Sequence, residues 1–314
     1  MSVQSLNSRA IISEFYAALE ADTGQGWIDR VSMLFTSDQD SEEYRWIGQT
    51  PAMREWIGGR NAKGFQDNGL TIKNKHYEAT LEVLARDLRR DKTGQVLTRI
   101  RELALRANAH WASLLSTLIL NGASATCYDG QYFFDTDHSE GSSGSQSNSI
   151  SVDISALAAA AHGSTTLPSV EEMQQSILSG VSAIANFKDD QGEPMNELAS
   201  QFLVMVPPSL HFAALNAVAM PLGTGVTQQS ALGGFNVQVV SNARLSTWTA
   251  SFAVFRTDGM VKPFIRQQET EVQIKAKAEG SEFEFDNDMH QYGVDAWRNV
   301  GYGYWQHACL VTMT

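Results

Sequence analysis

The amino-acid sequence predicts an α+β fold from three observations. Segments with helical spacing of apolar residues and segments with strand-like alternation follow one another, without the strict alternation of a doubly wound sheet. The 314 residues are 43% hydrophobic and 18% charged, so the chain can bury a sizeable core in one or two domains. One predicted helix is unusually long, and we expect other parts of the molecule to be mounted on it.

Helical spacing defines four segments. A short amphipathic helix is predicted over 8–21, and a much longer one over 93–120, where an apolar stripe ends at Asn121-Gly122. At 1.5 Å per residue the long helix would measure roughly 42 Å. Two further helices are predicted, one after Pro168 and one over 209–220.

Strand-like alternation begins at residue 44. Asp67-Asn68-Gly69 contains the Asn-Gly pair of tight turns, which predicts a hairpin in which 58–66 faces 70–75. Only the base, 77–83, alternates apolar with polar residues. Because an isolated two-stranded ribbon is marginal in water, the polar tip is expected either to move freely or to lie against another molecule. Further strands are predicted at 202–206 (a buried central strand), 237–240, 252–256, 271–277 and 309–313.

Charge and cysteine content exclude several classes of protein. The net charge of -12 is the wrong sign for broad phosphate binding, so a nucleic-acid reader is not expected. Two cysteines, Cys127 and Cys309, are too few for a disulfide framework and fit a reducing cytoplasm. The N-terminus lacks a signal-peptide pattern, and no run approaches the roughly 18 apolar residues of a membrane span. We therefore expect a cytoplasmic product without membrane contact.

Patterns that indicate enzyme chemistry are weak. Asp135, Asp137 and His138, with Asp129 close by in the sequence, offer ligands for a divalent cation, which gives the alternative hypothesis of a metal-dependent hydrolase. The favoured interpretation is an Asp-rich turn whose carboxylates accept backbone N–H bonds, followed by a flexible Ser- and Gly-rich surface loop at 139–149. Cys127 and Cys309 are predicted to be buried structural residues. We expect no enzymatic activity and no cofactor.

The charges are distributed unevenly. Between Arg54 and Arg106 there are 12 Lys or Arg against 7 Asp or Glu, whereas the rest of the chain is strongly acidic. The segment after the first helix is predicted to be an extended acidic arm with few apolar side chains to bury. Together with the incomplete hairpin, this asymmetry indicates that the basic ribbon of one subunit docks on the acidic surface of its neighbour. The contact residues so predicted are Arg54, Arg60, Lys63, Lys73 and Lys75 on the ribbon, and Asp38, Asp40, Glu42 and Glu43 on the arm.

Four passages, in this order, resemble the major capsid proteins of tailed phages, specifically the major head subunits of Mu-like phages and prophages. The resemblance extends over nearly the whole chain. The passages are Leu84 to Asp91 leading into the long helix, Tyr128-Asp129-Gly130-Gln131 with 134–138, the turn 187–194 before 202–208, and 292–298 with 301–305.

The resemblance implies the Hong Kong-type capsid fold. Its parts map onto an N-terminal arm at 1–45, an E-loop hairpin at 46–85, a peripheral domain at 86–167 with the spine helix, an axial domain at 168–250, and a tail at 251–314 that returns to the peripheral domain. It further implies hexamers and pentamers in an icosahedral shell, or virion capsid, that encloses double-stranded DNA and is assembled in the bacterial host cytoplasm.

The same resemblance implies several partners. Because the chain begins almost directly with the arm, a separate scaffolding protein is expected, together with a portal and decoration proteins. We expect the E-loops to dock without covalent crosslinks. An encapsulin-like cellular nanocompartment of the same fold, which encloses an enzyme, is the alternative within this class.

Overall fold

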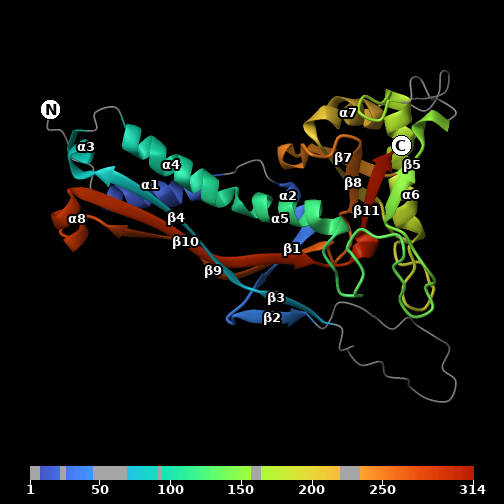
Figure 1. Cartoon of the computed structure of the whole chain (residues 1–314), viewed down its shortest axis with the longest axis horizontal. Coiled ribbons are helices and arrows are strands. Elements are labelled where there is room, and N and C mark those ends of the chain that lie inside the picture. The colour runs from blue at the N-terminus through green and yellow to red at the C-terminus, as the bar shows by residue number, and fades with distance from the viewer. Residues whose placement is uncertain (1–7, 22–25, 45–68, 91–93, 157–163, 220–233) are drawn as a thin grey trace, which may run out of the picture.

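The computed structural model describes residues 8–21, 26–44, 69–90, 94–156, 164–219 and 234–314. The molecule is elongated: a long sheet and two end-to-end helices run along it, and a second sheet with its own helices lies at one end (Figure 1). Helices and strands mix in both parts, so the α+β class is confirmed. None of the described helices is long and apolar enough to cross a membrane.

The long sheet has four strands in the order β1-β9-β10-β4. β1 runs parallel to β9, and the other neighbours are antiparallel. A short helix, α8 (Glu282–Asn287), joins β9 to β10 at the far end of the molecule (Figure 1). The strand bounds are Ser32–Thr36 for β1, Lys75–Leu84 for β4, Phe264–Lys277 for β9 and Met289–Tyr302 for β10.

Two strands of this sheet differ from the sequence prediction. β1 lies in the segment expected to be an extended arm with little to bury; Met33 and Phe35 instead pack against the main core beside β9. β10 was not predicted as a strand. Its buried face includes His290 and Arg298 between apolar residues, and these ionisable side chains obscure the alternation on which strand prediction depends.

The long helix predicted over 93–120 forms two segments, α4 (Gln95–Asn108) and α5 (His110–Leu120). Ala109 between them keeps right-handed helical backbone angles (φ -68°, ψ -4°), so the two lie end to end (Figure 1). The predicted end at Asn121-Gly122 is confirmed, since α5 stops at Leu120. A Cβ on Gly122 would lie 2.5 Å from Cδ2 of Phe134, so the following aromatic turn packs closely only against a glycine here.

The predicted N-terminal helix is α1 (Ser8–Leu19), and it packs against α4. Ile11 and Phe15 are fully buried in a small core that also contains Ile100 of α4 and Tyr292 of β10. The Ser8 backbone N–H donates to Glu279 Oε1 at 3.0 Å, which fixes the start of the helix to the end of β9. This part of the expected arm therefore finds its surface within its own chain.

The second sheet has five strands in the order β5-β11-β8-β6-β7. α6 (Val170–Asn186) packs on β8 and β11, and α7 (His211–Ala219) packs on β7 and α6. A capping box between Ser169 and Glu172 starts α6, just after Pro168 as predicted. The bounds are Ser149–Val152 for β5, Gln201–Val206 for β6, Asn236–Ser241 for β7, Ser251–Arg256 for β8 and Ala308–Met313 for β11.

The interior position of β6 confirms the predicted central strand, because Phe202 to Val206 are buried between β8 and β7. The predicted tail, 251–314, divides between the two sheets: β8 and β11 belong to the five-stranded sheet, and β9 and β10 to the long sheet. The chain thus crosses from one sheet to the other and back in this segment.

The loop predicted at 139–149 reaches the surface, where Ser139, Ser142 and Ser145 are exposed, but hydrogen bonds attach it to the rest of the fold. Ser143 and Asn148 are buried, the Ser142 N–H donates to the Asp190 carbonyl at 2.7 Å, and Asn148 Nδ2 donates to the Phe133 carbonyl at 2.7 Å. These partners are distant in sequence, so composition alone gives no sign of them.

The remaining short elements connect the larger ones. They are α2 (Trp27–Val31), the antiparallel pair β2 (Ser41–Tyr44) and β3 (Leu70–Lys73), and α3 (Ala85–Arg90).

Candidate assembly surface

β2 and β3 form the base of a hairpin whose connecting residues, 45–68, lie outside the described residues. Ser41 pairs with Lys73 and Tyr44 with Leu70 in antiparallel register. The predicted partner of this strand, 58–66, also lies outside the described residues. In the described part of the chain, residues 70–73 pair with residues 41–44. The segment that links these two strands is therefore much longer than the tight turn predicted at 67–69.

Buried polar groups attach this hairpin base to the long sheet. Gln267 of β9 donates to the Asn74 side chain at 2.8 Å and accepts from the Tyr44 hydroxyl at 2.9 Å. Burial, and then the charge of Glu42, raise the pKa of Tyr44 to about 12, so the hydroxyl keeps its proton as a donor. Because Asn74 and Gln267 are both buried, breaking either bond would leave an unsatisfied polar group. The base therefore holds a defined orientation on the sheet.

Close packing strengthens the same attachment. A Cβ on Gly301 of β10 would lie 2.4 Å from Cδ1 of Ile72, so β3 crosses the end of β10 only because this position is glycine.

The predicted contact residues fall into two groups. Arg54, Arg60 and Lys63 lie outside the described residues. The others surround the hairpin base, where the side chains of Asp38, Asp40, Glu43, Lys73 and Lys75 are exposed and Glu42 is half-buried.

Two of these predicted partners meet within one chain. Lys73 Nζ lies 3.3 Å from Asp40 Oδ2, and both side chains are about 70% exposed. Ser37 donates to Glu42 at 2.8 Å, so this acid also has a partner in its own chain. The sequence predicted ribbon and arm charges to meet between subunits, whereas here the arm and ribbon are adjacent strands of one hairpin.

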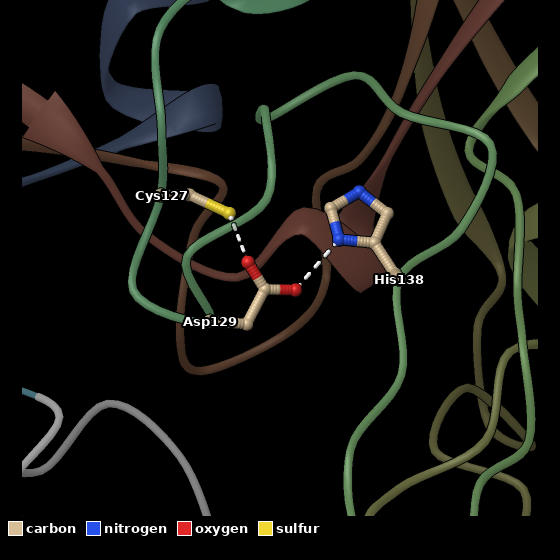
Figure 2. Close-up of side chains that lie close together, drawn as sticks. All are labelled: Cys127, Asp129 and His138. Carbon is tan, nitrogen blue, oxygen red and sulfur yellow. Dashed lines mark hydrogen bonds and ion pairs between the residues drawn. The ribbon is translucent and has the colours of Figure 1, made fainter.

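The Asp-rich turn does not assemble the proposed cation ligands Asp135, Asp137 and His138. The Asp135 carboxylate accepts the N–H groups of Tyr132 (3.1 Å) and Thr136 (2.7 Å), which is the favoured interpretation of this turn from the sequence. Asp137 is exposed. His138 is fully buried and directs Nδ1 at Asp129 Oδ2, 2.7 Å away (Figure 2).

Cys127, Asp129 and His138 are the group of possible metal ligands that the described residues bring together (Figure 2). Cys127 Sγ donates to Asp129 Oδ1 at 2.9 Å, and the His138 ring stacks on Trp305 with centroids 4.0 Å apart. Sequence reasoning noted Asp129 as a neighbour but gave Cys127 no part in this cluster. The sequence signal for including Cys127 was the tight turn at 127–130, which brings Cys127 and Asp129 close together.

The electrostatics of this cluster suit a set of hydrogen bonds. Burial, with the adjacent Asp129 carboxylate, raises the pKa of the Cys127 thiol far above its usual range, so the thiol keeps its proton and can donate to Asp129. Burial also acts to raise the pKa of Asp129, but hydrogen bonds from His138 and Cys127 outweigh it and lower the pKa below its ordinary value. A retained proton on sulfur and an ionised Asp129 make each contact a charge-assisted hydrogen bond. Cys127 and Cys309 are both buried, as predicted.

Two exposed apolar features were not predicted. Phe212 and Leu215 of α7 lie about one turn apart and are 77% and 42% exposed. Phe285 of α8 is 91% exposed beside Glu282, Glu284 and Asp286. Large exposed apolar side chains that gather on a surface are typical of interaction sites. For α7, the sequence did contain a signal of an interaction site, because the predicted helix 209–220 carries apolar residues on every side.

The fold is that of a tailed-phage capsid protein, which confirms the Hong Kong-type fold expected from the sequence. It resembles the subunit in the procapsid of bacteriophage JBD30 with a TM-score of 0.56 at 22% identity, over 97% of this chain and 73% of that one. The family model for the Mu-like prophage major head subunit gpT matches residues 4–160 and 227–314, more than half of the chain. The chain belongs to this family.

Two curated relatives agree with this assignment. The chain is 35% identical over 122 residues to the Mu-like prophage FluMu major head subunit of Haemophilus influenzae, and 30% identical over 125 residues to the major capsid protein of Escherichia phage Mu. These alignments cover 39% and 40% of this chain and 40% of each relative. The match is thus to less than half the length of these relatives.

Proposed function

We propose that this chain is the major capsid protein of a Mu-like phage or prophage, and that its copies assemble as hexamers and pentamers into an icosahedral shell around double-stranded DNA. The observation that carries the proposal is the firmly anchored base of a hairpin that connects β2 to β3, on a subunit whose family is that of Mu-like head subunits. A rigid base positions a long connection for contact with a neighbour.

The structure supports particular roles for the parts of the chain. The long sheet with α4 and α5 corresponds to the peripheral domain, and the five-stranded sheet with α6 and α7 to the axial domain near the capsomer centre. The exposed Phe212 and Leu215 on α7 would then contact equivalent helices around that centre. The hairpin residues Arg54, Arg60 and Lys63 would dock on the acidic surface of the adjacent subunit.

The net charge of -12 suits a wall that surrounds DNA without binding it tightly, because like charges repel. The proposed partners are other copies of the chain, a separate scaffolding protein, a portal and decoration proteins. The shell would form in the cytoplasm of the bacterial host and persist as the virion capsid.

The direct test is to express the chain with and without the scaffolding protein of its phage, and to examine the product by sedimentation and electron microscopy. Closed particles of megadalton mass are expected, and subunits that remain at 34.5 kDa under every assembly condition would contradict the proposal. What the particles enclose distinguishes the two kinds of shell. Double-stranded DNA in particles from lysates of induced cells supports a phage head, and enzyme cargo would support the nanocompartment alternative.

A further inference from the structure

The short helix α8 carries a phenylalanine that its own chain does not cover. Phe285 is 91% exposed at the far end of the molecule, where α8 joins β9 to β10 (Figure 1). A buried phenylalanine removes about 150–250 Å² of surface from water. A ring of this size that stands in solvent on a projecting helix is typical of a contact with another chain.

Hydrogen bonds hold α8 in a fixed shape. The Ser281 side chain caps the helix by accepting the Glu284 N–H at 3.2 Å. The Glu284 carboxylate in turn accepts the Gly280 N–H at 2.8 Å and lies 2.9 Å from Nε2 of the buried His290. Phe285 is therefore presented by a helix that is already ordered, so a contact made through it costs little conformational entropy.

A pocket of about 620 Å³ lies at the same end of the molecule, between β4, α3 and α4. An engineered cavity of about 150 Å³ accepts benzene, so this pocket has room for a phenylalanine ring and the chain beside it. The exposed Phe285 ring does not fill the pocket of its own chain. The apolar residues that line the pocket are Leu81, Val83, Leu84, Val96 and Met289.

Two arginines and two acids also line the pocket, and their pairing distinguishes them. Glu82 accepts a hydrogen bond from the Gln291 side chain at 2.7 Å, and Asp87 lies 3.8 Å from Nε of Arg86. Arg90 and Arg99, by contrast, are exposed and form no ion pair among the described residues. The pocket thus offers cations to a partner, whereas its own acids already have neighbours.

The charges around Phe285 have the opposite sign. Glu282 lies one turn before Phe285, and Asp286 follows it directly; both acids are exposed and form no ion pair within the described part of the chain. No Lys or Arg occurs between 278 and 288. An aromatic ring flanked by two available acids therefore complements an apolar pocket flanked by two available cations.

We propose that α8 of one copy inserts Phe285 into the pocket between β4, α3 and α4 of a second copy, with Glu282 and Asp286 beside Arg90 and Arg99. The projecting helix and the pocket are different surfaces, so the contact is heterologous and can continue around a closed ring of copies. The inference rests on the proposed function, because it requires that copies pack together. It adds a contact at the end of the subunit opposite the five-stranded sheet.

The first test compares Phe285→Ala with Met260→Ala, in assembly with the scaffolding protein. Met260 is the matched control because it is a large apolar residue, 94% exposed, outside α8 and the pocket. Neither variant should shift the melting temperature of the free subunit, since neither side chain is packed. Phe285→Ala should lower particle yield about tenfold, as expected for an anchor residue, and Met260→Ala should not. Equal yields from the two variants would overturn the inference.

A charge exchange tests the flanking contacts. Glu282→Arg with Asp286→Arg should lower particle yield, and so should Arg90→Glu with Arg99→Glu, because each pair of substitutions places like charges together. The chain that carries all four substitutions should recover most of the wild-type yield. Failure of the fourfold variant to exceed either pair would contradict the proposed pairing.

A crosslink identifies the occupant of the pocket. Subunits with Phe285→Cys are mixed with subunits with Val83→Cys, assembled, treated with a short bismaleimide and analysed by mass spectrometry. Because each chain carries one of the two new thiols, a link between positions 285 and 83 joins two copies. Both native cysteines are buried, which limits competing links. The link is expected in particles and not in the unassembled mixture.

A link from position 285 only to the scaffolding protein, a link already present before assembly, or no link at position 285 while other sites react would each overturn the inference. All of these results leave the proposed function intact, provided that the wild-type chain forms particles. If the wild-type chain forms none, both proposals fail.

Discussion

The two ends of the molecule bury their strands in different ways. In the five-stranded sheet every residue of β6 from Phe202 to Val206 is buried, because helices and neighbouring strands cover both faces. In the long sheet the interior strand β10, Met289–Tyr302, alternates buried with half-buried residues over most of its length, because one face is incompletely covered. The first region therefore has a core covered on both faces. The second leaves one face of its sheet incompletely covered and, among the described residues, buries a cation, that of Arg298, without a counter-ion.

This difference indicates which region depends on neighbours. Unpaired sheet edges and exposed faces are sites where a second chain can add contacts. A self-contained core at one end, by contrast, can keep the subunit folded before assembly. Stability of the subunit and affinity between subunits should therefore respond to different substitutions.

The largest expected effect compares two phenylalanines that are both 0% exposed, Phe255 of β8 and Phe15 of α1. Phe255→Ala should lower the free energy of unfolding by about 3–5 kcal/mol, the usual cost of this truncation in a core. Phe15→Ala should mainly release α1 from α4, since a terminal helix can open locally. Urea unfolding measures the loss of global stability, and amide hydrogen exchange measures the local opening of α1. Equal loss of protection throughout the chain in both variants would contradict the division.

Acid should destabilise the self-contained end through His307. Burial, and then the charge of Arg256, lower the pKa of His307 to about 4 from an ordinary value of 6.5. Between these values the unfolded chain binds the proton and the folded chain does not, so stability is present above pH 6.5 and is lost as pH falls toward 4. The loss is of order 3 kcal/mol. Urea midpoints at pH 7 and 4.5 should differ less for His307→Gln, and an unchanged difference would contradict this assignment.

Charge reversal on the hairpin should affect assembly and leave the subunit folded. The double variant Arg60→Glu with Lys63→Glu is expected to reduce particle yield about tenfold, which corresponds to about 1.4 kcal/mol. Reversal of Arg9 and Lys188, exposed residues elsewhere, is the matched control. Thermal unfolding of the subunits should shift little, as for most surface substitutions. Full yield from the hairpin variant would exclude docking through these charges.

The smallest expected effect concerns Lys73 and Asp40. Their side chains are 71% and 69% exposed, and exposed ion pairs contribute about 0–1 kcal/mol. A double-mutant cycle with Lys73→Ala and Asp40→Ala should therefore give a coupling below about 1 kcal/mol in urea unfolding of the subunit. A larger coupling would show that this pair helps to hold the hairpin base.

Local sequence patterns predicted the elements whose packing follows a simple period. The stripe of the long helix, its end at Asn121-Gly122 and the apolar run of β6 are all present. The patterns failed where the buried face is mixed, as on β10 with His290 and Arg298, and where polar residues find distant partners, as Asn148 does with Phe133. Windowed patterns contain no information on contacts of that separation.

The sequence by itself determined the α+β class, the long helix, the buried cysteines, and, through four ordered passages, the resemblance to Mu-like head subunits. Only the tertiary structure decided that Asp40 and Lys73 form an ion pair at the hairpin base, that Asp129 rather than Asp135 meets His138, and that Arg298 is buried without an ion pair in the part of the chain that the structure describes. The reason is physical: helical and strand periods are set by neighbours in the chain, whereas the partner of a charge is set by how distant segments pack.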